Sequence, residues 1–366
     1  MNLHTPLCDL LKISVPIVQS GMGTLAGAEL AAAVSEAGGL GIVGSAWAEP
    51  DALLETIRQV RLRTRRPFGV NVLLPDELRP PLSPSTVTEA AAERVQGIAN
   101  EARARLGLPP RHGRPPAFPD LIPRYLEIVL EERVPVLSIG LGHPGADLLA
   151  RCRELGIVTL AMVTTVEDAR IVEAEGVDVV VAQGGEAGGH RSHFAKPADP
   201  AEGRIGTLTL VPQVVDAVGI PVLAAGGIAD GRGLAAVLAL GAQGALMGTR
   251  FAATREAVAP EAYRLALVGA RAEDTVLTDR WTGRWARVIA NPLQGSLSST
   301  EALPPYLQQS ALTDVMEAAA AQNRRDLMPL YAGQSVGLVH DLPGAGEVVR
   351  RIAMEADSVS AKIHFS

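Results

Sequence analysis

Eight short apolar runs, separated by segments with helical periodicity, constrain the fold of this chain more than any other feature. The runs are Pro16–Ser20, Leu40–Ser45, Phe68–Leu74, Val134–Gly140, Ile157–Val163, Val177–Gln183, Ile220–Ala225 and Gln243–Gly248. Their unbroken apolar character is typical of parallel strands that are buried on both faces. Eight such strands alternating with helices predict an α/β fold, a closed (β/α)8 TIM barrel, with a doubly wound open sheet as the alternative.

Five of the intervening segments are predicted to be helices. They are Ala26–Ala37, Asp51–Arg63, Ala146–Leu155, Val166–Glu175 and Gly231–Leu240. The fourth of them opens with the capping pattern Thr165-x-x-Asp168. A final helix, about Gly346–Ala356, is expected to return to the barrel.

Two long segments interrupt the alternation. Pro75–Pro119 is rich in Pro, Ala and Arg and contains one predicted helix, Ala90–Leu106. Glu261–Gln334 holds most of the Trp and Tyr residues and is expected to be a mostly helical lid over the carboxyl end of the barrel. The predicted domains are therefore a barrel over 1–258, a smaller helical lid over 259–333, and a C-terminal return to the barrel over 334–366.

Composition narrows the classes of function. The net charge of −7 gives no reason to expect a nucleic-acid or acidic-membrane partner. The apolar runs are far shorter than the roughly 20 residues that span a bilayer, and the N-terminus lacks a secretory pattern. Two cysteines without a CxxC motif suggest a reducing compartment and no metal. We expect a cytoplasmic enzyme with a small-molecule substrate, for which a homodimer is a compatible assembly.

Glycine-rich turns follow the seventh and eighth predicted strands. The seventh runs into Ala225-Gly226-Gly227-Ile228, and the eighth into Met247-Gly248-Thr249. Glycines let a phosphate approach backbone N–H groups closely, and barrel enzymes commonly bind phosphate after these two strands. Taken singly the glycines would make only tight turns. As a pair after consecutive strands they predict a phosphate site.

The sixth strand is followed by Gly184-Gly185-Glu186-Ala187-Gly188-Gly189-His190. Such a loop can pass close to a planar ring while it holds one imidazole at the mouth of the barrel, and His suits proton transfer near neutral pH. We therefore interpret His190 as functional, although a lone His is usually structural. The buried amide of Asn71, within the third strand, must be hydrogen-bonded either to a ligand or to the backbone.

Four other motifs do not change this interpretation. Gly140–Gly145 matches GxGxxG, but the next strand lacks the acidic residue of a dinucleotide site. Gly333–Gly337 matches GxSxG, but no helix suited to a nucleophile elbow follows. His190 and His193 have no third metal ligand nearby. Trp281 and Trp285, at helical spacing, fit core packing as well as a substrate pocket.

In combination, several motifs resemble one enzyme family. They are Pro16–Gln19 with Met22, Gly38–Gly41, Phe68–Asn71, Glu186–Arg191, Ala225–Gly231 and Met247–Thr249. Together they resemble the nitronate monooxygenases, formerly 2-nitropropane dioxygenases, and their relatives, the FMN-dependent enoyl-ACP reductases of the second type. Tyr306–Thr313 and Tyr331–Gln334 resemble the monooxygenase branch, although Leu307 replaces the usual Pro. Thr249-Arg250-Phe251 resembles the reductases equally.

The resemblance implies FMN at the barrel mouth and assigns a role to each matching residue. The backbone at Gly21, Met22 and Gly23 would contact the flavin ring, which Asn71 and Gln183 would hydrogen-bond and Gly188 would approach. Gly226, Gly227, Gly248 and Thr249 would hold the phosphate. His190 matches the family's active-site histidine, and Tyr306, Trp281 and Trp285 would wall the substrate pocket.

The leading functional hypothesis is FMN-dependent oxidation of alkyl nitronates, or of nitroalkanes, by O2 to a carbonyl compound and nitrite. An NAD(P)H-dependent FMN reductase acting on a quinone or an enoyl thioester is the alternative. A non-catalytic flavin-binding barrel is disfavoured because storage needs neither His190 nor an aromatic lid. IMP-dehydrogenase-like chemistry is disfavoured because neither Cys8 nor Cys152 follows the sixth strand.

Overall fold

Eight parallel strands form a closed barrel in the computed structural model, which describes residues 3–46, 48–197, 199 and 204–362. The strands are β1 (Ile17–Gln19), β2 (Gly41–Gly44), β3 (Phe68–Leu73), β4 (Val136–Gly140), β5 (Val158–Val163), β6 (Val179–Gln183), β8 (Val222–Ala225) and β9 (Gly244–Met247). Their hydrogen-bonded order is β1-β9-β8-β6-β5-β4-β3-β2. Leu40 N donates to Ile17 O at 2.9 Å, which joins the first and second strands and closes the ring. The predicted (β/α)8 barrel is confirmed.

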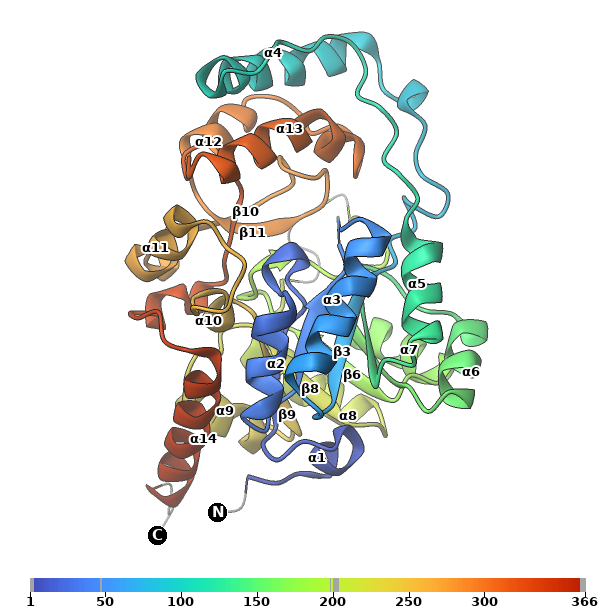
Figure 1. Cartoon of the computed structure of the whole chain (residues 1–366), viewed down its shortest axis with the longest axis vertical. Coiled ribbons are helices and arrows are strands. Elements are labelled where there is room, and N and C mark those ends of the chain that lie inside the picture. The colour runs from blue at the N-terminus through green and yellow to red at the C-terminus, as the bar shows by residue number, and fades with distance from the viewer. Residues whose placement is uncertain (1–2, 47, 198, 200–203, 363–366) are drawn as a thin grey trace.

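Helices surround the barrel (Figure 1). They are α2 (Ala28–Glu36), α3 (Pro50–Arg63), α5 (Ile122–Glu131), α6 (Ala146–Glu154), α7 (Val166–Glu175), α8 (Thr207–Ala217), α9 (Gly231–Ala239) and α14 (Ala345–Lys362). The C-terminal helix α14 returns to pack on α9 and α2, as expected. A Cβ at Gly231 would lie 2.3 Å from Ala356 N, so this close helix contact requires glycine.

Among the described residues, aliphatic side chains close the amino-terminal end of the barrel. Its interior is filled by aliphatic side chains such as Val18, Ile42 and Leu160, and Leu7 and Leu11 belong to the same cluster. The last two come from α1 (Pro6–Leu11), which lies at the end of the barrel nearer the chain termini (Figure 1). Any ligand of the barrel must therefore approach the carboxyl ends of the strands.

The segment after β9 combines helices with short strands. It contains α10 (Thr249–Ala252), α11 (Glu261–Gly269), α12 (Pro292–Leu297) and α13 (Leu307–Ala321), with β10 (Thr275–Thr278), β11 (Ala286–Ile289) and β12 (Leu330–Tyr331). These strands form an antiparallel sheet, whose fourth strand is β7 (Gly189–His190) from the loop after β6. The predicted lid segment thus contains an antiparallel sheet in addition to its helices. Trp281 and Trp285 lie in the β10–β11 turn and not on a helix.

The Pro-rich segment 75–119 packs against the outer side of the segment that follows β9 (Figure 1). Its helix α4 (Glu89–Leu106), predicted to within one residue, packs along α13 (Figure 1). The fully buried Arg103 of α4 donates to Asp314 Oδ2 at 3.0 Å and to Ala311 O at 2.7 Å. Short 3-10 turns, η1 (Gly23–Leu25), η2 (Pro84–Thr86), η3 (Ala272–Asp274) and η4 (Gln334–Leu338), complete the fold. Within the described ranges, no helix has the length and apolarity to cross a bilayer.

Candidate active site

A cavity of about 730 Å³ opens at the carboxyl ends of the barrel strands. The residues predicted for cofactor binding and catalysis all line it: Gly21, Met22, Gly23, Asn71, Gln183, Gly188, His190, Gly226, Gly227, Gly248 and Thr249. They come from six separate segments of the chain. The three residues predicted to wall the substrate pocket, Tyr306, Trp281 and Trp285, are not among the lining residues.

The two glycine turns lie side by side because β8 and β9 are hydrogen-bonded neighbours. Gly226 and Gly227 have φ angles of 104° and 74°, in the left-handed region that favours glycine. A Cβ at Gly226 would also lie 3.0 Å from Ala187 N. Backbone alone therefore faces the cavity here, as close approach of a phosphate requires. Asp230 already caps α9, accepting from Arg232 N and Gly233 N, so a phosphate would depend on the turn amides.

The side chain of Asn71 is held by hydrogen bonds to the neighbouring barrel strand β4. Its Nδ2 donates to Ser138 O and to Ser138 Oγ, both at 3.1 Å, so the backbone partner considered from the sequence exists. A Cβ at Gly21 would lie 2.3 Å from Asn71 Cβ, so the first loop can cross the amide only with glycine at this position. Asn71 and Gly21 thus bring β3 and the loop after β1 together at the cavity floor.

Gln183 shapes the loop that carries the histidine. Its Nε2 donates to His190 O, and its Oε1 accepts from Ser192 N, each at 2.9 Å. The side chain predicted to hydrogen-bond a flavin thus also holds the backbone on either side of Arg191. This interaction, with the pairing of β7 to β11, fixes the position of the imidazole.

His190 presents a neutral imidazole to the cavity. Its Nε2 lies 2.8 Å from Thr282 Oγ1, and its ring centroid lies 5.5 Å from that of Tyr331. Burial, reinforced by the positive charge of Arg284, lowers the pKa of His190 to about 4. The ring is therefore uncharged at neutral pH and can accept a proton or donate a hydrogen bond.

Arg284, the positive charge that acts on this histidine, is itself paired with a carboxylate. It is 2% exposed and pairs with Glu77, at 2.9 Å between Nη2 and Oε2. Its Nη1 also donates to His193 O at 3.0 Å. A buried arginine with a carboxylate partner is expected to be held rigidly. The ion pair links the segment after β3 to the β10–β11 turn beside His190.

Two tyrosines that were not predicted as site residues line the cavity. Tyr263 of α11 and Tyr331 of β12 meet there, with Tyr263 Oη donating to Tyr331 O at 2.6 Å. Burial raises the pKa of both phenols, which remain protonated donors. Their place among the lid aromatics was visible in the sequence. Their approach to the cavity depends on the antiparallel sheet, which was not predicted.

Comparison with known proteins identifies the family. The family model described as nitronate monooxygenase matches residues 4–355. The chain belongs to the nitronate monooxygenase family. It is 36% identical to a probable nitronate monooxygenase of Staphylococcus haemolyticus over 340 residues, covering 92% of each chain. A second relative, from Staphylococcus aureus, is 34% identical over 359 residues, which cover 96% of this chain and 97% of that protein.

Solved structures agree with this assignment. A nitroalkane oxidase from Streptomyces ansochromogenes superposes with a TM-score of 0.88 and 36% identity, covering 98% of this chain and 100% of that one. FabK from Thermotoga maritima gives a TM-score of 0.79 and 32% identity, covering 98% of both chains. This nitronate monooxygenase family member is therefore an enzyme, a flavin-dependent oxidoreductase.

Proposed function

We propose that this enzyme uses FMN and O2 to oxidise alkyl nitronates, and neutral nitroalkanes, to a carbonyl compound and nitrite. The observation that carries the proposal is one cavity, in a member of this family, lined by both the paired glycine turns and His190. The similarity to a nitroalkane oxidase supports the extension to neutral substrates.

The residues of the cavity fit FMN. Backbone amides at the β8 and β9 turns would hold the phosphate, and Gly21, Met22 and Gly23 would lie against the ring. A cavity of about 730 Å³ falls within the range of small-molecule and cofactor sites. When bound, FMN supplies the redox chemistry, accepting electrons from the substrate and passing them to O2.

The chain's own residues bind and orient the substrate. His190 would hydrogen-bond the nitro or nitronate oxygens and would remove the α-proton when the substrate is neutral. Tyr263 and Tyr331 line the cavity and would wall it. For the predicted pocket residues we propose an indirect role. Tyr306 N donates to Thr282 O, next to the histidine, and Trp281 lies in the core beneath the sheet.

A second candidate function is NAD(P)H-dependent reduction of a quinone or an enoyl thioester. The likeness to FabK favours it, because that chain covers almost all of this one at 32% identity. The two functions differ in which compound reduces the flavin. A nitronate does so in the first, and a reduced nicotinamide does so in the second.

Oxygen consumption tests the proposal. Purified protein loaded with FMN is mixed with propyl-2-nitronate or with propionate 3-nitronate, and nitrite is measured in parallel. We expect both oxygen uptake and nitrite release. In an anaerobic control, nitronate should bleach the flavin faster than NADH or NADPH. Rapid bleaching by nicotinamide alone, without nitronate turnover, would favour the reductase instead.

A further inference from the structure

We infer that Thr282 is a positioning residue for His190: its hydroxyl holds the proton of the neutral imidazole on Nε2, so that Nδ1 is the base that takes the α-proton of a nitroalkane. The inference rests on the proposed function for its substrate, but the protonation of the ring can be measured without turnover. Thr282 is 2% exposed and does not line the cavity, so it acts only through His190.

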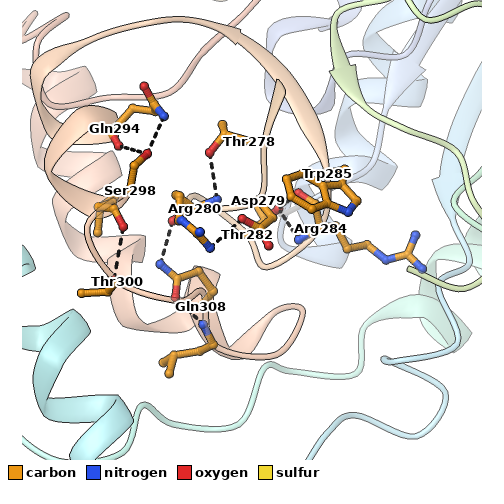
Figure 2. Close-up of polar contacts among 12 residues, drawn as sticks. Thr278, Asp279, Arg280, Thr282, Arg284, Trp285, Gln294, Ser298, Thr300 and Gln308 are labelled. Carbon is orange, nitrogen blue, oxygen red and sulfur yellow. Dashed lines mark hydrogen bonds and ion pairs between the residues drawn. The ribbon is translucent and has the colours of Figure 1, made fainter. Parts of the chain in front are cut away.

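The β10–β11 turn holds Thr282 in one place (Figure 2). Gly283 N donates to Asp279 O at 2.8 Å, and Thr282 O accepts from Tyr306 N at 2.8 Å. Gly283 has a φ of 81°, and a Cβ there would lie 2.6 Å from Pro305 Cα. The turn is therefore closed by its own hydrogen bond and is anchored through Thr282 O to the segment that precedes α13.

Side chains fix the same turn from outside. Asp279 Oδ2 accepts from Lys196 Nζ at 2.7 Å, and Gln308 Nε2 donates to Arg280 O at 2.7 Å. Figure 2 shows Asp279, Arg280 and Gln308 arranged around the turn, with the Thr282 side chain among them. A hydroxyl held on so constrained a turn can define the orientation of a ring that it contacts.

The hydroxyl of Thr282 has three possible partners. His190 Nε2 lies at 2.8 Å, and Arg284 N and Arg284 O each lie at 3.4 Å. A hydroxyl donates once and accepts twice. Arg284 N can only donate and Arg284 O can only accept, so all three contacts are satisfied together only when His190 Nε2 carries the proton. This arrangement leaves Nδ1 with its lone pair.

Nδ1 is the nitrogen available to substrate. Nε2 is turned toward the buried Thr282, whereas the ring of His190 lines the cavity. In the reaction, the C–H bond beside the nitro group breaks and its proton passes to Nδ1. The electron pair remains on the substrate, which becomes a nitronate. The hydrogen bond from Nε2 to Thr282 is the same before and after Nδ1 takes up the proton. The imidazole ring therefore need not rotate during the reaction.

The charges around His190 suit an ion pair formed with the substrate. Arg284 of the turn acts on His190 and is paired with Glu77. Arg287 of β11 and Arg191 of the loop both interact with Glu186. The nearby phenols, Tyr331 and Tyr263, are neutral. An imidazolium at position 190 would gain a partner of opposite charge in the nitronate that it had just produced.

The protonation of His190 is tested directly by 15N NMR of the imidazole nitrogens in the FMN-loaded protein. The chain has seven histidines, and the spectrum of His190→Asn identifies the signals of residue 190. We expect a protonated Nε2 and an unprotonated Nδ1 in the wild type and in Thr282→Ser. In Thr282→Val, which cannot accept a hydrogen bond from Nε2, we expect the signals of the two nitrogens to average. A proton on Nδ1 in the wild type would overturn the inference.

Kinetics supply the second test, through the ratio of activity on 2-nitropropane to that on propyl-2-nitronate. Only the first substrate needs a base. We expect Thr282→Val to lower kcat/KM for 2-nitropropane at least about tenfold, with propyl-2-nitronate changed by less than about threefold, and Thr282→Ser to restore the ratio. An equal loss on both substrates, or no rescue by serine, would overturn the positioning role.

A matched threonine–histidine pair provides the control. Thr164 Oγ1 lies 3.1 Å from His193 Nδ1, and neither residue lines the cavity. Thr164→Val should leave the substrate ratio unchanged, and a change as large as that of Thr282→Val would overturn the inference. If the wild type oxidises neither compound, the proposed function fails, while the NMR result still decides the tautomer.

Discussion

His190 is a residue whose chemistry depends on contacts from distant parts of the chain. Its backbone is held by Gln183 of β6 and by Ala286 of β11, and its ring lies between Thr282 and Tyr331. These neighbours provide no carboxylate in contact with the imidazole, so burial dominates its ionisation. At the residue scale, the enzyme therefore presents an uncharged base and a hydrogen-bonding group in one side chain.

Replacement of His190 by Asn should separate binding from proton transfer. Asn keeps a polar group of similar reach but cannot act as a base. We expect kcat/KM for 2-nitropropane to fall by roughly 10²- to 10⁴-fold, the usual contribution of a general base. The protein should still bind FMN, since the substitution leaves the backbone of the β8 and β9 turns intact. Undiminished turnover of the nitroalkane would refute the role of His190 as base.

Two buried histidines should make the folded state sensitive to acid. Burial lowers the pKa of His190 and of His193 from 6.5 to about 4. Between these values the unfolded chain binds more protons than the folded one. The free energy of unfolding should therefore be highest above pH 6.5 and decrease as the pH falls toward 4. Each histidine contributes about 1.4 kcal/mol to this decrease per unit of difference between its folded and unfolded pKa.

Urea unfolding at pH 7.5, 6 and 5 measures this effect. The His193→Asn variant loses one of the two groups, while its carboxylates are those of the wild type. Its free energy of unfolding should therefore decrease less steeply with acid. Parallel pH profiles for the two proteins would show that the protonation of His193 is not linked to unfolding.

At the scale of elements, the barrel strands could be predicted because burial on both faces leaves a continuous apolar run. The helices α5 and α8 were not predicted, for local reasons. The sequence of α8, Thr207–Ala217, begins Thr-Leu-Thr-Leu, which alternates like a strand, and contains Pro212. The helix α5, Ile122–Glu131, directly follows a Pro-rich segment and has proline in its first turn. Tertiary packing decides the structure of both segments.

The antiparallel sheet was beyond prediction for a different reason. Its strands have two to four residues, too few for alternation to be recognised, and β7 pairs with β11 nearly one hundred residues later. Long-range pairing leaves no local pattern. The glycine turns and His190 were predicted because their residue types carry the information. Tyr331 and Thr282 were missed because this sheet and its β10–β11 turn bring Tyr331 to the cavity and Thr282 to His190. Tyr263 of α11 was missed because it reaches the cavity beside Tyr331.

Between elements, the Arg284–Glu77 pair should contribute strongly to stability. Glu77→Gln removes the partner of an arginine that is 2% exposed. Breaking a buried pair costs about 3–5 kcal/mol, and we expect the lower end because Glu77 is partly exposed. Chemical denaturation measures the change. Glu89→Gln, which breaks the exposed contact between Arg114 and Glu89, is the control and should change stability by less than about 1 kcal/mol. Equal effects would contradict the expectation.

At the scale of the whole molecule, the two ends of the barrel differ: the amino-terminal end is packed, and the carboxyl end holds a cavity. Aliphatic side chains fill its interior and α1 packs at the amino-terminal end. At the carboxyl end the loops leave a cavity in place of a core. A ligand that binds there contacts loops from β1, β3, β6, β8 and β9 at once. Because the unfolded chain lacks this arrangement, binding should stabilise the whole fold.

FMN should therefore raise the melting temperature of protein from which flavin has been removed. Binding at 100 times Kd contributes about 2.7 kcal/mol, which corresponds to a rise of a few degrees in a chain of this size. Gly226→Ala should abolish the rise, because its Cβ would lie 3.0 Å from Ala187 N in a turn with a φ of 104°. Gly107→Ala strains a positive-φ helix cap in open space and should melt earlier yet still respond to FMN. If both variants responded equally, the β8 turn would not be part of the phosphate site, and the proposed binding of the FMN phosphate by the β8 and β9 turns would have to be abandoned.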